Sequence, residues 1–188
     1  MKNNLYVITG GPGVGKTTLI NALKNAGYFT IQETARSIIQ QQLENGGQAL
    51  PWDDKELYAF LMLKASILDY NKATISPQAN NVVFFDRGVI DAVCYAKMIG
   101  YIFPEPIMKE ALKCKCNRKV FILPPWLEIY ETDNERKQSW EEAEHTYLQM
   151  KATYQKYGYK ILDLPKDTIQ NRKEFVLNHI TELNHENK

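Results

Sequence analysis

The chain has 188 residues, a formal net charge of +1, and 44% hydrophobic residues. This length is enough for one α/β domain with a full hydrophobic core, and too short for two such domains. The near-neutral charge and the lack of any apolar run of about eighteen residues exclude a general attraction to nucleic acid and a membrane span.

The first predicted element is a buried strand, because Leu5–Ile8 is a short, apolar run rich in β-forming residues. Residues 10–17 follow it and match the phosphate-loop pattern G-x-x-x-x-G-K-[ST]. Apolar residues then recur at helical spacing between Leu19 and Leu23, which predicts a helix that begins near Lys16. Strand, glycine-rich loop and helix is the order that a phosphate-binding loop requires.

In such a loop, glycines let successive backbone N–H groups turn inward, and these groups hold phosphate oxygens together with the positive end of the helix. Lys16 is expected to reach the β- and γ-phosphates, and the Thr17 hydroxyl is expected to bind Mg²⁺. The predicted nucleotide-binding residues are Gly11, Pro12, Gly13, Val14, Gly15, Lys16, Thr17 and Thr18.

The next predicted strand is Tyr28–Gln32, and Glu33 stands just past its end. A carboxylate there has two interpretations. It is a candidate base that takes the proton of an attacking hydroxyl, or an acid that stabilises the start of the following helix. The predicted buried face of that helix consists of Ala35, Ile38, Ile39 and Leu43.

A long helix is predicted after a loop, with Asp53 or Asp54 as its N-cap. Its spacing predicts an inward face made of Leu57, Phe60, Leu61, Ile67 and Leu68.

Val82–Phe85 is a continuous apolar run, which is typical of a strand buried on both faces of a parallel sheet. Asp86, directly after it, is predicted to hold Mg²⁺ opposite Thr17, with an N-cap of the following helix as the alternative. Arg87 is a candidate ligand of phosphate or substrate oxygens, or else one half of an ion pair. Asp91 either binds substrate or stabilises the helix N-terminus.

Lys119–Leu123 is the fourth predicted strand, and two prolines end it. The polar segment of about residues 125–139 is predicted to be a lid. Arg136, and less strongly Lys137, are candidate lid cations that neutralise charge on the phosphates, with a solvated charge cluster as the alternative. A helix over Glu141–Tyr157 and a fifth strand over Tyr159–Leu164 follow.

Asp167 is the predicted cap of a last helix. Strands and helices therefore alternate throughout, which predicts an α/β fold with a parallel sheet and helices on both faces. We expect residues 1–188 to form one domain. Ligands of such sheets bind beyond the carboxyl ends of the strands, so the glycine loop, Glu33 and Asp86 are expected to share one edge.

The cysteines are Cys94, Cys114 and Cys116, an odd number without a spaced framework, which favours a reducing, cytoplasmic location. Cys114 and Cys116 lack a second pair at metal-ligand spacing, so free thiols are expected. The first predicted strand begins at Leu5, so we expect no cleaved signal. No feature predicts an oligomeric state.

Four stretches in this order resemble the P-loop kinase-like AAA domain family of small predicted ATPases. They are Val7–Thr18, Gln32–Arg36, Phe85–Asp91 and Glu131–Arg136. The family is similar in plan to nucleoside and nucleotide kinases, including the ribosylnicotinamide kinase type. The resemblance implies a three-layer P-loop NTPase fold with five parallel strands in the order 2-3-1-4-5 and a kinase-like lid.

The resemblance also implies roles for single residues. In deoxynucleoside kinases a Glu after the second strand acts as base, and Glu33 occupies that place. An acidic–Arg pair follows the third strand there, as Asp86 and Arg87 do here, and Arg136 matches a lid arginine. No Asn-Lys-x-Asp guanine motif occurs, which favours ATP over GTP.

The expected function is an ATP- and Mg²⁺-dependent phosphotransferase that acts on a small-molecule acceptor, with a nucleoside or a nucleotide as candidates. The alternative is a regulatory NTPase switch, which binds or slowly hydrolyses ATP or GTP to control a partner.

Overall fold

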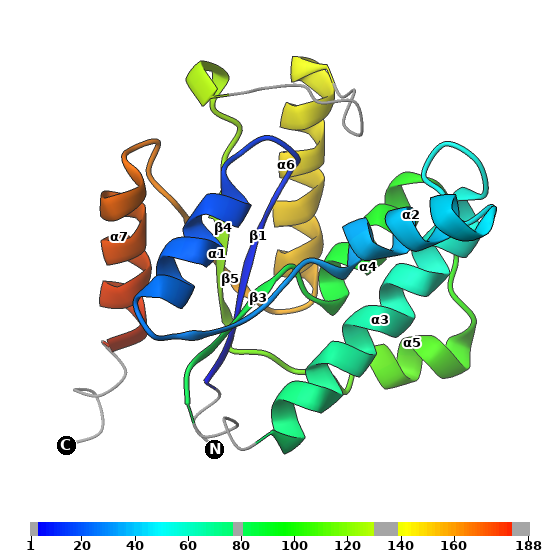
Figure 1. The fold of residues 1–188 in the computed structure, drawn as a ribbon, viewed down its shortest axis with the longest axis horizontal. Helices are drawn as coiled ribbons and strands as arrows, with labels where there is room; N and C mark the ends of the chain where they lie inside the picture. The colour runs from blue at the N-terminus through cyan, green and yellow to red at the C-terminus, as the bar shows by residue number, and fades with distance from the viewer. Residues whose placement is uncertain (1–3, 77–80, 130–138, 182–188) are drawn as a thin grey trace.

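The computed structural model describes residues 4–76, 81–129 and 139–181. Its centre is a five-stranded parallel sheet in the order β2-β3-β1-β4-β5, which confirms the expected strand order (Figure 1). The strands are β1 (Leu5–Gly10), β2 (Phe29–Ile31), β3 (Val83–Asp86), β4 (Lys119–Leu123) and β5 (Lys160–Asp163). β1 therefore lies in the middle of the sheet, and its carboxyl end leads directly into the glycine-rich loop.

Helices follow the strands in the alternation that the sequence predicts. They are α1 (Lys16–Asn25), α2 (Thr34–Asn45), α3 (Lys55–Ile75), α4 (Val89–Met98), α5 (Glu105–Ala111), α6 (Trp140–Lys156) and α7 (Ile169–Thr181). A short 3₁₀ turn, η1 (Leu127–Ile129), follows β4. In the part of the chain that the structure describes, no helix combines the length and apolar character that a transmembrane span requires.

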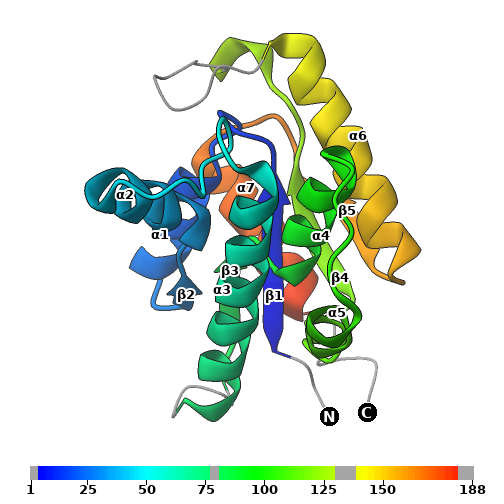
Figure 2. The same ribbon diagram turned by 90° about the vertical axis from the view of Figure 1, so that its right-hand side faces the viewer.

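The two faces of the sheet are covered by different helices, because successive side chains of a strand point to opposite sides. On β1, Tyr6 and Ile8 pack into a core formed with α1 and α7. Leu5 and Val7 pack into a second core formed with α3, α4 and α6. Figures 1 and 2 show this three-layer arrangement, with α1 and α7 on one side of the sheet.

α2 packs mainly against α3 and not against the sheet, with Ala35, Ile38 and Ile39 buried against Tyr58. The prediction that three residues of these helices are buried is wrong. Leu43 in α2 is 58% exposed, and Leu57 and Leu68 in α3 are 42% and 53% exposed. α3 contacts α2, α4 and α5 from different sides, so apolar residues occur around most of its circumference and their spacing does not identify one face.

The structure also decides between candidate helix caps. Asp54 is the N-cap of α3, since its Oδ1 accepts a hydrogen bond of 2.8 Å from the backbone N–H of Leu57. The predicted Asp167 cap of α7 is off by one residue. The Thr168 hydroxyl accepts from the N–H of Asn171, whereas the Asp167 carboxylate accepts from the Asn171 side-chain amide at 2.9 Å.

Candidate active site

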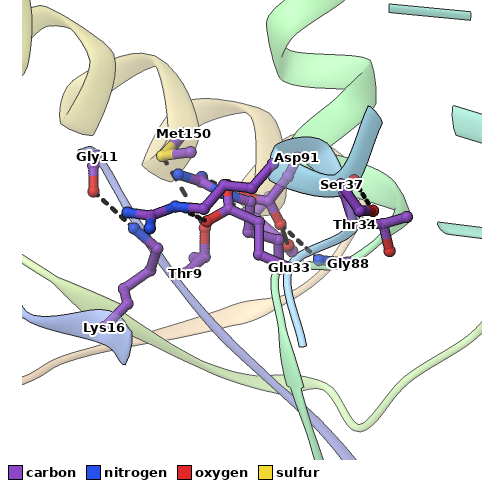
Figure 3. A network of polar contacts seen from close by, with 12 residues as sticks. Thr9, Gly11, Lys16, Glu33, Thr34, Ser37, Gly88, Asp91 and Met150 are labelled. Carbon is purple, nitrogen blue, oxygen red and sulfur yellow. Dashed lines mark hydrogen bonds and ion pairs between the residues drawn. The ribbon is translucent and has the colours of Figure 1, made fainter. Parts of the chain in front are cut away.

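The carboxyl ends of β1, β2 and β3 bring the predicted site residues together. Ile8 of β1 lies beside Asp86 of β3, and Ile31 of β2 lies beside Phe85, so the segments that follow these strands start side by side. Figure 3 shows Lys16 beside Gly11, and Glu33 on the side of Asp91, at this edge. The expectation that the glycine loop, Glu33 and Asp86 share one edge is therefore confirmed.

The glycine-rich loop has the backbone conformations that its glycines permit. Gly10 has φ of 145°, and a Cβ there would lie 2.7 Å from the carbonyl oxygen of Leu123, so only glycine fits between β1 and β4. Gly15 has φ of 85° and is the N-cap of α1. No side chain that the structure describes caps this N-terminus, and Thr17 is exposed. The first backbone N–H groups of α1 are therefore suited to hold an anion.

Lys16 is buried within this loop. Its Nζ donates a hydrogen bond of 2.7 Å to the carbonyl oxygen of Gly11 (Figure 3). Burial, followed by the charge of Arg87, lowers the pKa of Lys16 to about 8. The ammonium group is thus held inside the loop by one of the loop's own carbonyl groups.

Glu33 and Arg87 form the closest ion pair of the site. Arg87 Nε donates to Glu33 Oε1 at 2.6 Å, and its Nη1 lies 3.5 Å from Asp91 Oδ1. Burial alone would raise the pKa of Glu33, but the charges of Arg87 and then Lys16 lower it to about 2. Glu33 is therefore ionised at neutral pH and is held in place by a guanidinium group.

Arg87 itself has φ of 73°, a left-handed conformation that is uncommon for residues other than glycine. Its backbone N–H donates to the carbonyl oxygen of Ile8 at 3.0 Å, which fixes the turn after β3 against the end of β1. Burial would lower the pKa of Arg87, but Glu33, and then Asp91, raise it. Arg87 is thus both the ion-pair partner that one interpretation predicted and a permanent cation at the edge of the sheet.

Asp86 is 4% exposed, and its Oδ1 is buried without a hydrogen-bond partner among the residues that the structure describes. Burial raises the pKa of its carboxyl group. Gly88, and not Asp86, is the N-cap of α4, so the capping interpretation is wrong. A buried carboxylate oxygen without a partner fits a Mg²⁺ ligand.

The predicted metal-binding set is small. In residues 4–76, 81–129 and 139–181, no three His, Cys, Asp or Glu side chains are grouped as metal ligands. The predicted ligands, Thr17 and Asp86, are only two, and Mg²⁺ is an ion that usually keeps several waters and binds substrate phosphates.

Asp91 lies at the start of α4 and is 3% exposed. Its Oδ2 accepts from the N–H of Gly88 at 2.7 Å and from the Tyr154 hydroxyl at 2.5 Å, and its Oδ1 accepts from the Thr9 hydroxyl. The helix N-terminal role predicted as one alternative is confirmed. The same contacts tie α4 to α6 and to the end of β1. They also fix the Asp91 carboxylate, which lies 3.5 Å from Arg87 Nη1.

A pocket lies next to Glu33, Asp86 and Arg87, between the sheet and α3. Further polar side chains that line it include Thr34, whose hydroxyl donates to Asp69 Oδ2 at 2.5 Å. Glu33, Asp86 and Arg87 therefore border one small pocket.

Arg172 of α7 was not predicted as a site residue. It is 2% exposed, and its Nη1 donates to the carbonyl oxygen of Val14 in the glycine-rich loop at 3.1 Å. Its guanidinium carbon lies 4.7 Å from the ring centre of Trp126. No local signal points to Arg172, because a single Arg in an amphipathic helix normally lies on the solvated face. Arg136 and Lys137 lie outside the described residues, so their roles stay predictions.

Comparison with known structures supports the fold. The NadR protein in complex with NR has a TM-score of 0.72 at 19% identity, covering 95% of this chain and 50% of that chain. This chain thus spans about half the length of NadR. Deoxyadenosine kinase from M. mycoides, with products dCMP and dCDP bound, has a TM-score of 0.65 at 14% identity, covering 95% of this chain and 99% of that chain.

YorR from Bacillus subtilis, in complex with phosphorylated GDP, has a TM-score of 0.56 at 16% identity, covering 96% of this chain and 98% of that chain. The comparison with curated proteins gave no match. The family model described as AAA domain matches residues 5–172. This stretch contains the glycine-rich loop, Glu33, the pair after β3, and Arg172. The chain therefore belongs to this P-loop kinase-like AAA domain family.

Proposed function

We propose that the protein is an ATP- and Mg²⁺-dependent phosphotransferase that acts on a small acceptor bearing a hydroxyl or a phosphate group. The observation that carries this proposal is the convergence of a phosphate loop with an ionised carboxylate, Glu33, which Arg87 holds at 2.6 Å. A nucleotide-binding switch needs the phosphate loop but has no need of a carboxylate that a guanidinium group holds in place. Kinases among the similar structures are consistent with this proposal.

The donor half of the proposed site consists of Lys16 and the amides of residues 11–18, which hold the phosphates. ATP is favoured as donor because NadR has been crystallised with NAD and AMP-PNP, an ATP analogue. Thr17 and Asp86 would hold Mg²⁺, which neutralises charge on the β- and γ-phosphate oxygens when bound. Mg²⁺ bound there would give Asp86 Oδ1 the partner that it lacks among the described residues.

In the acceptor half, Glu33 accepts a hydrogen bond from the attacking hydroxyl and orients it in line with the transferred group. Its pKa of about 2 makes it a weak base while Arg87 is bound to it. This suits phosphoryl transfer, because the transition state is loose and little proton transfer is required before it is reached. Arg87 stays charged and stabilises the negative charge of the transferred group.

We further propose that residues 1–188 act as one domain with a lid at about residues 125–139. Arg136 of that segment would neutralise negative charge on the transferred phosphoryl group. These assignments are predictions, since residues 130–138 lie outside the described part of the chain.

The test is an acceptor panel. The protein is incubated with Mg²⁺ and ATP and, one at a time, with nucleosides, nucleotides and hydroxyl-bearing vitamins, and products are identified by mass spectrometry. At least one acceptor should gain one phosphoryl group. Lys16→Ala should abolish that product, while Lys24→Ala, an exposed lysine on α1, should leave it unchanged. ADP formation that no acceptor alters would favour the regulatory switch and overturn the proposal.

A further inference from the structure

Arg172 contacts three segments that are distant in the sequence. Its Nη1 donates to Val14 in the glycine-rich loop, and its Nε donates to the carbonyl oxygen of Pro165 in the loop after β5 at 3.0 Å. Its guanidinium carbon lies over the ring of Trp126, which stands at the start of the segment predicted as a lid. One side chain of α7 therefore fixes the phosphate loop, the β5–α7 loop and the chain leaving β4.

The contact with the phosphate loop is tight. A Cβ placed on Gly15 would lie 3.2 Å from Arg172 Nη1, so the guanidinium group lies directly behind the turn that starts α1. Its hydrogen bond holds the carbonyl of Val14 toward α7. The N–H of Gly15 belongs to the same peptide unit and, because that unit is planar, points the opposite way.

The charge of Arg172 is not neutralised within the described residues. No carboxylate there lies within ion-pair distance of it, and its Nη2 is buried without a hydrogen-bond partner. Burial lowers its pKa, with only a weaker opposing effect from Asp167. A buried and uncompensated cation costs free energy unless a counter-charge is supplied, and a bound polyphosphate would supply one at this loop.

We propose that Arg172 is a positioning residue for the phosphate donor: it holds the Val14–Gly15 peptide in its polyphosphate-binding orientation and adds an unneutralised positive charge behind the loop. The inference rests on the proposed function for the identity of the donor. It assigns to α7 a part in binding the phosphates. It predicts that loss of Arg172 weakens contacts with the phosphates and leaves contacts with the base unchanged.

The test compares Arg172→Met, Arg172→Lys and wild type in their affinity for Mg²⁺-ATP and for Mg²⁺-tripolyphosphate, measured by isothermal titration calorimetry well below the melting temperature of each variant. Arg172→Met should weaken the affinity for both ligands at least about tenfold and by the same factor, because the positive charge and the fixed orientation of the Val14–Gly15 peptide are lost. Arg172→Lys should recover part of the affinity, since it keeps the charge. Arg118→Met, which removes an exposed arginine, is the matched control and should bind as wild type does.

A merely structural role predicts a lower melting temperature with ligand affinities within twofold of wild type, and this result would overturn the inference. If Arg172→Met does not fold, Arg172→Gln replaces it, with the same expected loss. Wild-type protein that binds tripolyphosphate but phosphorylates no acceptor would refute the proposed function and leave the inference standing. Wild-type protein that binds neither ligand would refute both.

Discussion

At the scale of single residues, the fold lowers the pKa of two groups of the site, Glu33 and Lys16. Arg87 and Lys16 keep Glu33 ionised, so that it can accept a hydrogen bond from a hydroxyl group. Burial brings the pKa of Lys16 to about 8, so that its proton is bound less firmly until a phosphate arrives. Both shifts have consequences that can be measured without knowing the acceptor.

Glu33 should make the stability of the protein depend on pH in an acidic window. Its folded-state pKa of about 2 lies below the ordinary value of 4.5, so its contribution is present above about pH 4.5 and is lost as the pH falls toward 2. Glu33→Gln should therefore lower the free energy of unfolding most at pH 5–7, and the difference from wild type should shrink below pH 4.5.

Urea denaturation at a series of pH values measures this difference. Glu44→Gln, which changes an exposed glutamate of α2, serves as the control and should show no such convergence. A difference between wild type and Glu33→Gln that stays constant from pH 6 to pH 2.5 would show that Glu33 is not held by Arg87 in solution.

Lys16 should make nucleotide affinity depend on pH in a basic window. Bound phosphate favours the charged lysine, so binding takes up a proton wherever the free protein has lost it, and the affinity for ATP should fall as the pH rises past about 8. The phosphates are fully ionised above that pH and do not cause the decline. Titration calorimetry from pH 7 to pH 9.5 measures the effect, and Lys16→Met should bind weakly throughout. A flat wild-type profile would contradict the role of the Lys16 charge.

At the scale of elements, the sequence predicted every helix and strand that forms the sheet and its two covering layers. Apolar runs such as Val83–Phe85 and helical spacings such as Leu19–Leu23 are local signals, and local signals suffice to identify an element. The buried face of α3 was partly wrong because this helix packs against several neighbours. Arg172 was missed because its partner in the phosphate loop, Val14, lies more than a hundred residues away along the chain.

The N-cap of α3 can be tested by mutation. The sequence left Asp53 and Asp54 as alternatives, and the structure assigns the cap of α3 to Asp54. Asp54→Ala should lower the free energy of unfolding by about 1 kcal/mol, because a backbone N–H at the start of α3 loses its acceptor. Asp53→Ala, an exposed neighbour, should have little effect in the same urea titrations. Equal losses in the two variants would show that the cap assignment is wrong.

At the scale of the whole molecule, the parallel sheet creates the site. Its strand order puts β1 between β3 and β4, so the phosphate loop emerges beside Asp86 on one side and beside the chain leading to Trp126 on the other. The sequence predicted which segments would meet, since ligands of such sheets bind at the carboxyl ends of the strands. It did not predict the pairing of Glu33 with Arg87, which depends on the left-handed turn after β3.

The measurement that tests the central claim most directly is the fate of the γ-phosphoryl group. Wild type and Glu33→Gln are incubated with Mg²⁺ and γ-³²P-ATP in the presence of the pooled acceptor panel, and the label is partitioned between organic products and inorganic phosphate. Wild type should place most of the label in an organic product. Glu33→Gln should bind ATP normally but form that product about 10²-fold more slowly, because the acceptor hydroxyl is no longer oriented by a carboxylate. Label that appears only as inorganic phosphate, at the same rate with and without the panel, would contradict the account.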